Sequence, residues 1–150
     1  MRTFQLQLLQ AVLATQQGLR AIQRDHVHLD RTAPIADDDC DAINIAPGEA
    51  KFEVYGSEGD YDTLRCRMQF VLAHHTRGDP QTALVDPAMA ESHQALMADP
   101  SLGGLALRLS VTGSRPRKAS ANGTVGIYEL TYEATVLVNE RTLEIWAHQA

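Results

Sequence analysis

The chain of 150 residues has the length of one domain, and its 44% of hydrophobic residues can form a core without disulfides or metals. A net charge of −6 and a pI near 5.4 argue against a surface that binds duplex nucleic acid, because phosphate contacts need clustered lysines and arginines. We therefore expect a single domain, residues 1–150, without sequence-specific binding of nucleic acid, although an acidic lumen would let DNA pass.

The first predicted element is an amphipathic helix that ends near Arg24. Hydrophobic residues recur at three- and four-residue spacing from Phe4 onward, and glutamine, threonine and arginine fill the opposite side. The stretch from Met1 to Ile22 has five glutamines and no continuous apolar run, which argues against a signal peptide or a membrane span. Synthesis in the cytoplasm is expected. An exposed, mobile polar loop should follow, with the acidic run Asp37, Asp38 and Asp39.

Three strands are expected in the middle of the chain. Ala42–Ile45 and Lys51–Tyr55 are short, and Pro47-Gly48 predicts a turn between them. The stretch from Tyr61 to His74 is clearer. Its hydrophobic residues alternate with arginine and glutamine, as in a strand with one buried face: Leu64, Cys66, Met68, Phe70 and Leu72.

A second helix is predicted to begin at Asp86-Pro87, because aspartate caps free backbone N–H groups and proline suits the first helical position. Asp79-Pro80 is a weaker start signal of the same kind. The helix should run for roughly three turns and close at Asp99-Pro100 and Gly103-Gly104. Its apolar side consists of Met89, His93, Leu96 and Met97. His93 is expected to be a packing residue there.

A long hairpin is expected after this helix. Its strands, Leu105–Thr112 and Thr124–Val138, alternate hydrophobic and polar residues. The stretch Gly113–Gly123 between them should be a polar hairpin tip that carries Arg115, Arg117 and Lys118. The order helix, strands, helix, hairpin predicts an α+β fold, with an antiparallel sheet of about four strands and two main helices packed on one face.

One group of residues is a candidate metal site, and it has a plainer explanation. Side chains of metal-ligating types lie close together in the sequence: His26, His28, Asp37, Asp38, Asp39 and Cys40. The combination has no established geometry and suits no single metal, so a solvated acidic loop is the expected state. Two cysteines form no disulfide framework. Cys66 is expected to be a core thiol separate from Cys40, with a disulfide as the alternative in an oxidising compartment.

Acid–base and nucleophilic sites are not expected either. His74 and His75 are neighbours in a strand and point to opposite faces, which suits a strand end better than joint catalysis. Glu129 and Glu133 share a strand face that hydration explains at least as well as a paired-carboxylate site. The sequence has no nucleophile elbow and no phosphate-binding glycine loop. We expect no catalytic residue, no cofactor and no metal, and an assembly part rather than an enzyme.

Two of the expected loops differ in charge: the loop before the first strand is acidic, and the tip of the last hairpin is basic. Loops of opposite sign suit head-to-tail contacts between copies, and such contacts close into a ring when the rotation permits. Two ordinary solvated loops are the alternative. The residues of the predicted subunit interface are Asp37, Asp38, Asp39, Arg115, Arg117 and Lys118.

Two stretches in the second half of the chain carry a family resemblance. From Leu96 to Leu105 the sequence reads LMADPSLGGL, and from Gly126 to Val136 it reads GIYELTYEATV. In tail-terminator and minor tail proteins of siphophages, a helix that ends in a similar sequence leads into a long β-hairpin whose last strand alternates in a similar way. The second half of this chain resembles those proteins. The long acidic loop before the first strand departs from that family.

The resemblance implies a subunit that assembles as a hexameric ring, which caps the finished tail tube and joins it to the head connector. The implied partners are further copies of the chain, the tail tube protein and the head-tail connector protein. The implied location is the tail or neck of the virion. Three alternatives remain open: a head-completion protein of the neck, a small metal-dependent enzyme, and an adaptor that binds a peptide along a strand edge.

Overall fold

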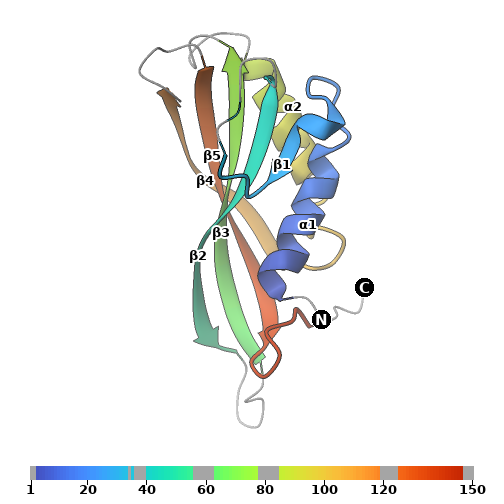
Figure 1. Cartoon of the computed structure of the whole chain (residues 1–150). Coiled ribbons are helices and arrows are strands. Elements are labelled where there is room, and N and C mark those ends of the chain that lie inside the picture. Colours follow the sequence, from blue (N-terminus) through green and yellow to red (C-terminus); the bar gives the residue numbers. More distant parts are fainter. Residues whose placement is uncertain are drawn as a thin grey trace.

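A computed structural model describes residues 3–33, 35, 40–55, 63–77, 85–118 and 125–146. This part of the chain has two layers, a twisted sheet and two α-helices on one of its faces (Figure 1). The expected α+β class is confirmed. No helix among these residues is long and apolar enough to cross a membrane. The elements are α1 (Phe4–Gln16), the 3-10 helix η1 (Arg24–His26), β1 (Val27–Leu29), β2 (Ala42–Val54), β3 (Thr63–Arg77), α2 (Val85–Met97), β4 (Arg108–Lys118) and β5 (Val125–Asn139).

The five described strands form one mixed sheet in the order β1-β2-β3-β5-β4. All neighbours except β1 and β2 pair antiparallel. The prediction of about four antiparallel strands missed β1, which pairs parallel with β2 where Val27–Leu29 meets Ile43–Ile45. Three residues are too few to show the alternation by which a sequence reveals a strand.

The expected turn at Pro47-Gly48 is absent from β2, which continues through these residues. The pairing with β3 only shifts register between Pro47 and Ala50, as at a β-bulge. Proline is tolerated here because β1 ends its pairing at Ile45, so that β2 is an edge strand from Ala46 onward in the described part of the sheet. The two predicted short strands are therefore one strand with an irregularity.

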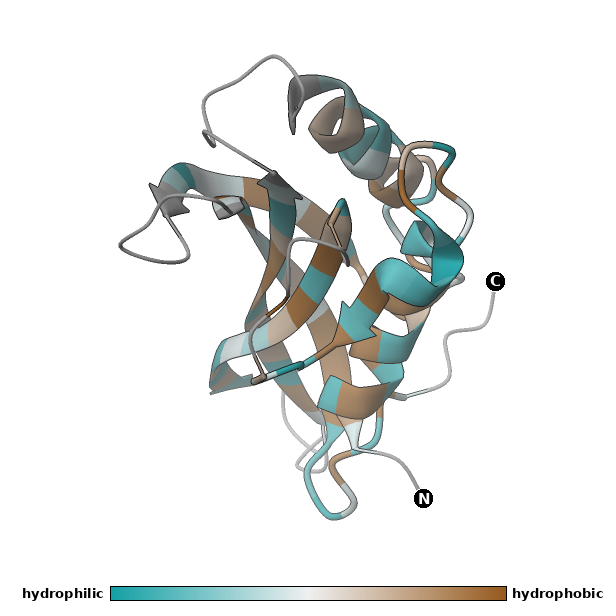
Figure 2. Cartoon of the chain, turned by 45° about the horizontal axis from the view of Figure 1, so that its top comes forward, coloured by the Kyte–Doolittle hydropathy of each residue, from teal (hydrophilic) through white to brown (hydrophobic). Residues whose placement is uncertain are grey.

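β3 and β5 form the centre of the sheet and pair over fifteen residues each. Hydrophobic and hydrophilic residues alternate along the strands (Figure 2). Their fully buried side chains are those that the alternation predicted: Cys66, Met68, Phe70, Leu72, Tyr132, Ala134, Val136 and Val138. The rings of Phe70 and Tyr132 stack with centroids 5.3 Å apart, which fixes the register of the two strands on the helix side.

α1 packs on this face through residues spaced four apart, and it is shorter than expected. Phe4, Leu8, Val12 and Gln16 are buried, but the helix ends at Gln16 and not near Arg24. Leu19 and Ile22 are nevertheless buried. Their spacing reflects a chain that turns at Gly18, a poor helix former, and returns to the core, and not a continuing helix.

α2 lies beside α1, and a pair of buried polar side chains joins them. The expected start at Asp86-Pro87 is one residue inside the observed helix. The Oγ of Ser92 donates to Oε1 of Gln16 at 2.5 Å, and Nε2 of Gln16 donates to the Ser92 carbonyl at 3.2 Å. Both side chains are fully buried, so this satisfied pair fixes the offset of the two helices. The alternative start Asp79-Pro80 lies outside the described residues.

The turn after α2 is organised by Asp99. Its carboxylate accepts hydrogen bonds from Oγ of Ser101 at 2.6 Å and from the backbone N–H of Gly103 at 2.8 Å. These donors lower the pKa of Asp99. Gly103 and Gly104 both have positive φ, 73° and 89°, which glycine adopts without steric cost. The expected turn is confirmed.

β4 begins three residues later than expected and extends further. It runs from Arg108 to Lys118, so the basic residues expected on a hairpin tip lie in the strand itself. Leu109 is buried, whereas Leu107 and Val111 are 52% and 46% exposed, although the alternation placed all three on one buried face. The reason is position: β4 is the last strand of the sheet, and the register shifts between Val111 and Gly113.

Replacing Gly48 tests the irregularity in β2. A Cβ at Gly48 would lie 2.8 Å from the backbone oxygen of Gln69 in β3, and a backbone atom cannot move aside easily. We expect Gly48→Ala to lower the free energy of unfolding by about 1–3 kcal/mol, measured by urea denaturation.

Gly113→Ala is the matched control, because Gly113 lies at the register shift of β4 and has no atom within 4 Å of an added Cβ. Its unfolding free energy should stay within about 0.5 kcal/mol of the unsubstituted chain. Equal losses in both variants would contradict the close approach at Gly48.

Candidate assembly surface

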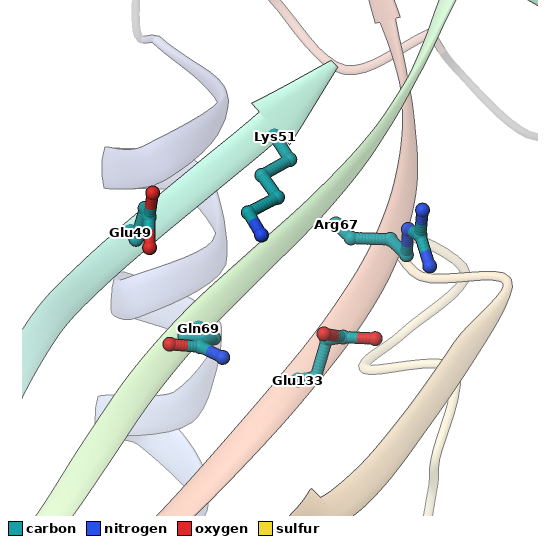
Figure 3. A pocket seen from close by; sticks show the side chains of 5 residues that line it. All are labelled: Glu49, Lys51, Arg67, Gln69 and Glu133. Atoms are coloured by element: carbon teal, nitrogen blue, oxygen red, sulfur yellow. The ribbon is translucent and has the colours of Figure 1, made fainter. Parts of the chain in front are cut away.

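The face of the sheet turned away from the helices carries a network of opposite charges. Oε1 of Glu53 in β2 forms ion pairs with Nη1 of Arg65 at 3.7 Å and with Nη2 of Arg67 at 4.0 Å, and both arginines lie on β3. All three side chains are about half exposed, so the pairs add little to stability and leave their charges open to a partner. A shallow hollow of about 110 Å³ lies here (Figure 3), lined by Glu49, Lys51, Arg67, Gln69 and Glu133.

The basic strand β4 forms one edge of the same sheet. Arg115 lies opposite Glu129 of β5, and its Nε donates to Oε1 of Glu129 at 3.2 Å. The Arg115 side chain is 74% exposed, so the cation faces solvent even while it is paired. Arg117 and Lys118 continue the strand, but their side chains are not described.

The acidic half of the predicted interface lies outside the described residues, because Asp37, Asp38 and Asp39 are not among them. Their contact with the basic residues therefore stays a prediction. What changes is the basic half, which belongs to a strand edge and not to a loop tip.

The remaining candidate metal ligands are placed separately. Nδ1 of His26 lies 3.2 Å from the Asp41 carbonyl, and Nε2 of His28 lies 3.4 Å from Nη1 of Arg31. Among the described residues, no three histidine, cysteine, aspartate or glutamate side chains are grouped as a metal site would require. Cys40 and Cys66 are thiols and not a disulfide. Burial raises the pKa of Cys66 to about 11, which keeps this core thiol protonated.

His74 and His75 lie inside β3 and not at its end, contrary to the expectation. The chain continues in strand pairing to Arg77. His74 points to the helix side and is only 2% exposed, and its ring nitrogens have no hydrogen-bond partner of good geometry in the described part of the chain. Burial lowers the pKa of His74 to about 4, and the backbone of Tyr128 opposes the shift only in part.

This histidine should make the fold sensitive to acid. Since its pKa is lower in the folded chain than the ordinary 6.5, the unfolded chain binds the proton first, and stability should fall as the pH drops from about 6.5 to about 4. A shift of this size corresponds to a loss of about 3 kcal/mol. His74→Phe should remove that loss, measured as unfolding free energy against pH.

His75→Phe is the matched control on the opposite side of the same strand, and this variant should keep most of the acid loss. An identical pH profile for the unsubstituted chain and His74→Phe would show that His74 is not the group responsible.

An open apolar groove beside α2 was not foreseen from the sequence. Its volume is about 340 Å³, and its described lining residues are Met89, Ala90, His93, Val111 and Leu130. His93 packs as expected, with Nδ1 2.9 Å from the Tyr132 hydroxyl and the two rings stacked. Burial raises the pKa of Tyr132, so the hydroxyl stays protonated. The groove was missed because alternation predicted that Val111 would be covered.

No protein-family model matches the sequence, and none of the curated proteins matches it. The fold, in contrast, is similar to that of a solved chain described as "Virion of native gene transfer agent (GTA) particle", with a TM-score of 0.57 and 14% sequence identity. The similarity covers 87% of this chain and 94% of that chain. The two chains share a fold. Since the likeness spans nearly all of both, it concerns the whole two-layer arrangement and not one hairpin.

Proposed function

We propose that the chain is a structural subunit of a phage or phage-like particle, a tail-completion protein of the tail-terminator type. In this role it forms a ring that caps the tail tube and joins it to the head connector. The observation that carries the proposal is the fold shared with a chain of the GTA virion over most of both chains. The resemblance of LMADPSLGGL and GIYELTYEATV to siphophage tail-terminator proteins supports it from the sequence.

Two features of the described surface fit such a role. The sheet ends in two edges, and one of them, β4, carries four basic residues and no acidic one between Arg108 and Lys118. The outer face carries charges of both signs, among them the exposed ion pairs of Glu53 with Arg65 and Arg67. Charges of this kind set the register of contacts between copies more than their strength.

Deleting the gene from the phage or prophage that encodes it tests the role directly. We expect overlong tails without heads by negative-stain electron microscopy, because loss of the cap leaves nothing to stop growth of the tube. Full heads beside separate tails of normal length would move the role to head completion. Normal infectious particles would contradict a structural role in the virion.

A triple reversal of the basic strand tests its part in assembly. Arg115→Glu, Arg117→Glu and Lys118→Glu together should prevent assembly of complete particles, because they invert the charge of the β4 edge. The fold should persist, since the Arg115 side chain is 74% exposed and its pair with Glu129, whose side chain is 12% exposed, contributes about 1 kcal/mol. Thermal melting followed by circular dichroism checks the fold, and particle counts check assembly.

Arg20→Glu with Arg24→Glu is the control, because both residues are exposed on the helix side of the chain. This variant should assemble normally. If the triple variant also gives normal particles, the basic strand takes no part in a subunit contact.

A further inference from the structure

The helix layer does not cover the whole sheet. α1 contacts β1 and β2, and α2 contacts β3, whereas β4 has no comparable helix contact among the described elements. Val111 of β4 therefore stays exposed, as does Leu107 just before this strand, and the groove between α2 and β4 stays open. Monomeric proteins rarely leave contiguous apolar surface of this kind without a use.

A second exposed apolar surface lies at the other edge of the sheet. Phe52 and Val54, near the end of β2, are 46% and 76% exposed. They belong to the part of β2 that β1 does not cover. The Phe52 ring makes an edge-to-face contact with Phe4, with centroids 5.5 Å apart, so it is held in place rather than loose.

The two surfaces differ in charge as well as in place. Between Ala46 and Val54 the β2 edge carries one lysine and two acidic residues, Glu49 and Glu53, of which Glu53 also forms the exposed ion pairs with β3. Between Arg108 and Lys118 the β4 edge carries four basic residues. The two patches are unlike, differ in charge and lie on opposite edges of one sheet, which suits a head-to-tail contact. Repeated, such a contact closes into a ring or continues as a filament, depending on the rotation between copies.

We propose that the apolar end of β2 in one copy docks into the groove between α2 and β4 of the next copy. Phe52 and Val54 are the inserted side chains, and Met89, Val111 and Leu130 line the receiving surface. This inference rests on the proposed function only in requiring that copies associate. In this contact the basic strand β4 faces the β2 edge of the neighbouring copy, which lies within the described residues. The β2 edge thus takes the place of the acidic run from Asp37 to Asp39.

Side-chain insertion fits β4 better than pairing of backbone strands across the contact. The register of β4 shifts between Val111 and Gly113, and Pro116 supplies no N–H group to a further strand. Irregularity, proline and clustered cations are the features by which edge strands resist strand addition. The groove offers apolar area instead, and a few buried apolar anchors supply most of the energy of such a contact.

Thiol cross-linking tests the geometry. In a Cys40→Ser background, purified proteins carrying Val54→Cys or Val111→Cys are treated with a short bifunctional maleimide, separately and mixed. Both positions are exposed and outside the core, so the variants should fold. The mixture should give about tenfold more cross-linked dimer than either protein alone, because a head-to-tail contact brings unlike positions together. A variant with both cysteines should give a ladder, and the same ladder in assembled particles.

Ala14→Cys, exposed on α1, replaces Val54→Cys in the control mixture and should give no such increase. Dimers from either single variant alone would indicate a symmetric contact and overturn the inference. Absence of the 54–111 product from both purified protein and particles would also overturn it. If deleting the gene gives overlong tails but the 54–111 product does not form, only the proposed contact is contradicted. If the product forms but deleting the gene leaves normal particles, only the proposed function is contradicted.

Discussion

The antiparallel pairing of β3 with β5 is the constraint on which the rest of the molecule depends. It joins two strands of fifteen residues each and buries one complete face of both, from Cys66 to Leu72 and from Leu130 to Val138. A large buried side chain such as Phe70 contributes on the order of 1.5–3 kcal/mol by leaving water. A slip by one residue would turn this whole face to solvent, so the register is strongly specified.

The helices are positioned against this face by packing and by one polar contact. Gln16 and Ser92 satisfy each other in the core between α1 and α2. Near the same place, backbone N–H groups of Arg20 and Ala21 donate to Oε1 of Glu91, which ties the turn after α1 to α2. The helix pair is thus set over β1, β2 and β3, and the inner side of β4 is left partly open as a consequence.

The proposed contact between copies depends on this incomplete helix layer. A chain that covered β4 with a third helix would have no groove and no exposed apolar residue at that edge. The present chain has both, together with an apolar and partly acidic edge on the far side. The proposed contact between copies uses both edges, and it is argued independently of the fold shared with a chain of the GTA virion.

The sequence alone determined the elements with strong local signals. Alternation over more than ten residues revealed β3 and β5, and the Asp-Pro and Gly-Gly pairs revealed the limits of α2 and its turn, because caps and positive φ are local requirements. The resemblance to tail proteins was carried by two of these stretches, the end of α2 with its Gly-Gly turn and β5.

Only the tertiary structure decided the rest. β1 is too short for a pattern, Pro47 is accommodated because β2 lies at an edge there, and Leu19 is buried without being helical. Val111 alternates like a core residue but is exposed, since no described helix covers β4. Position in the sheet and coverage by another layer are properties of distant residues, and a local pattern carries no information about them.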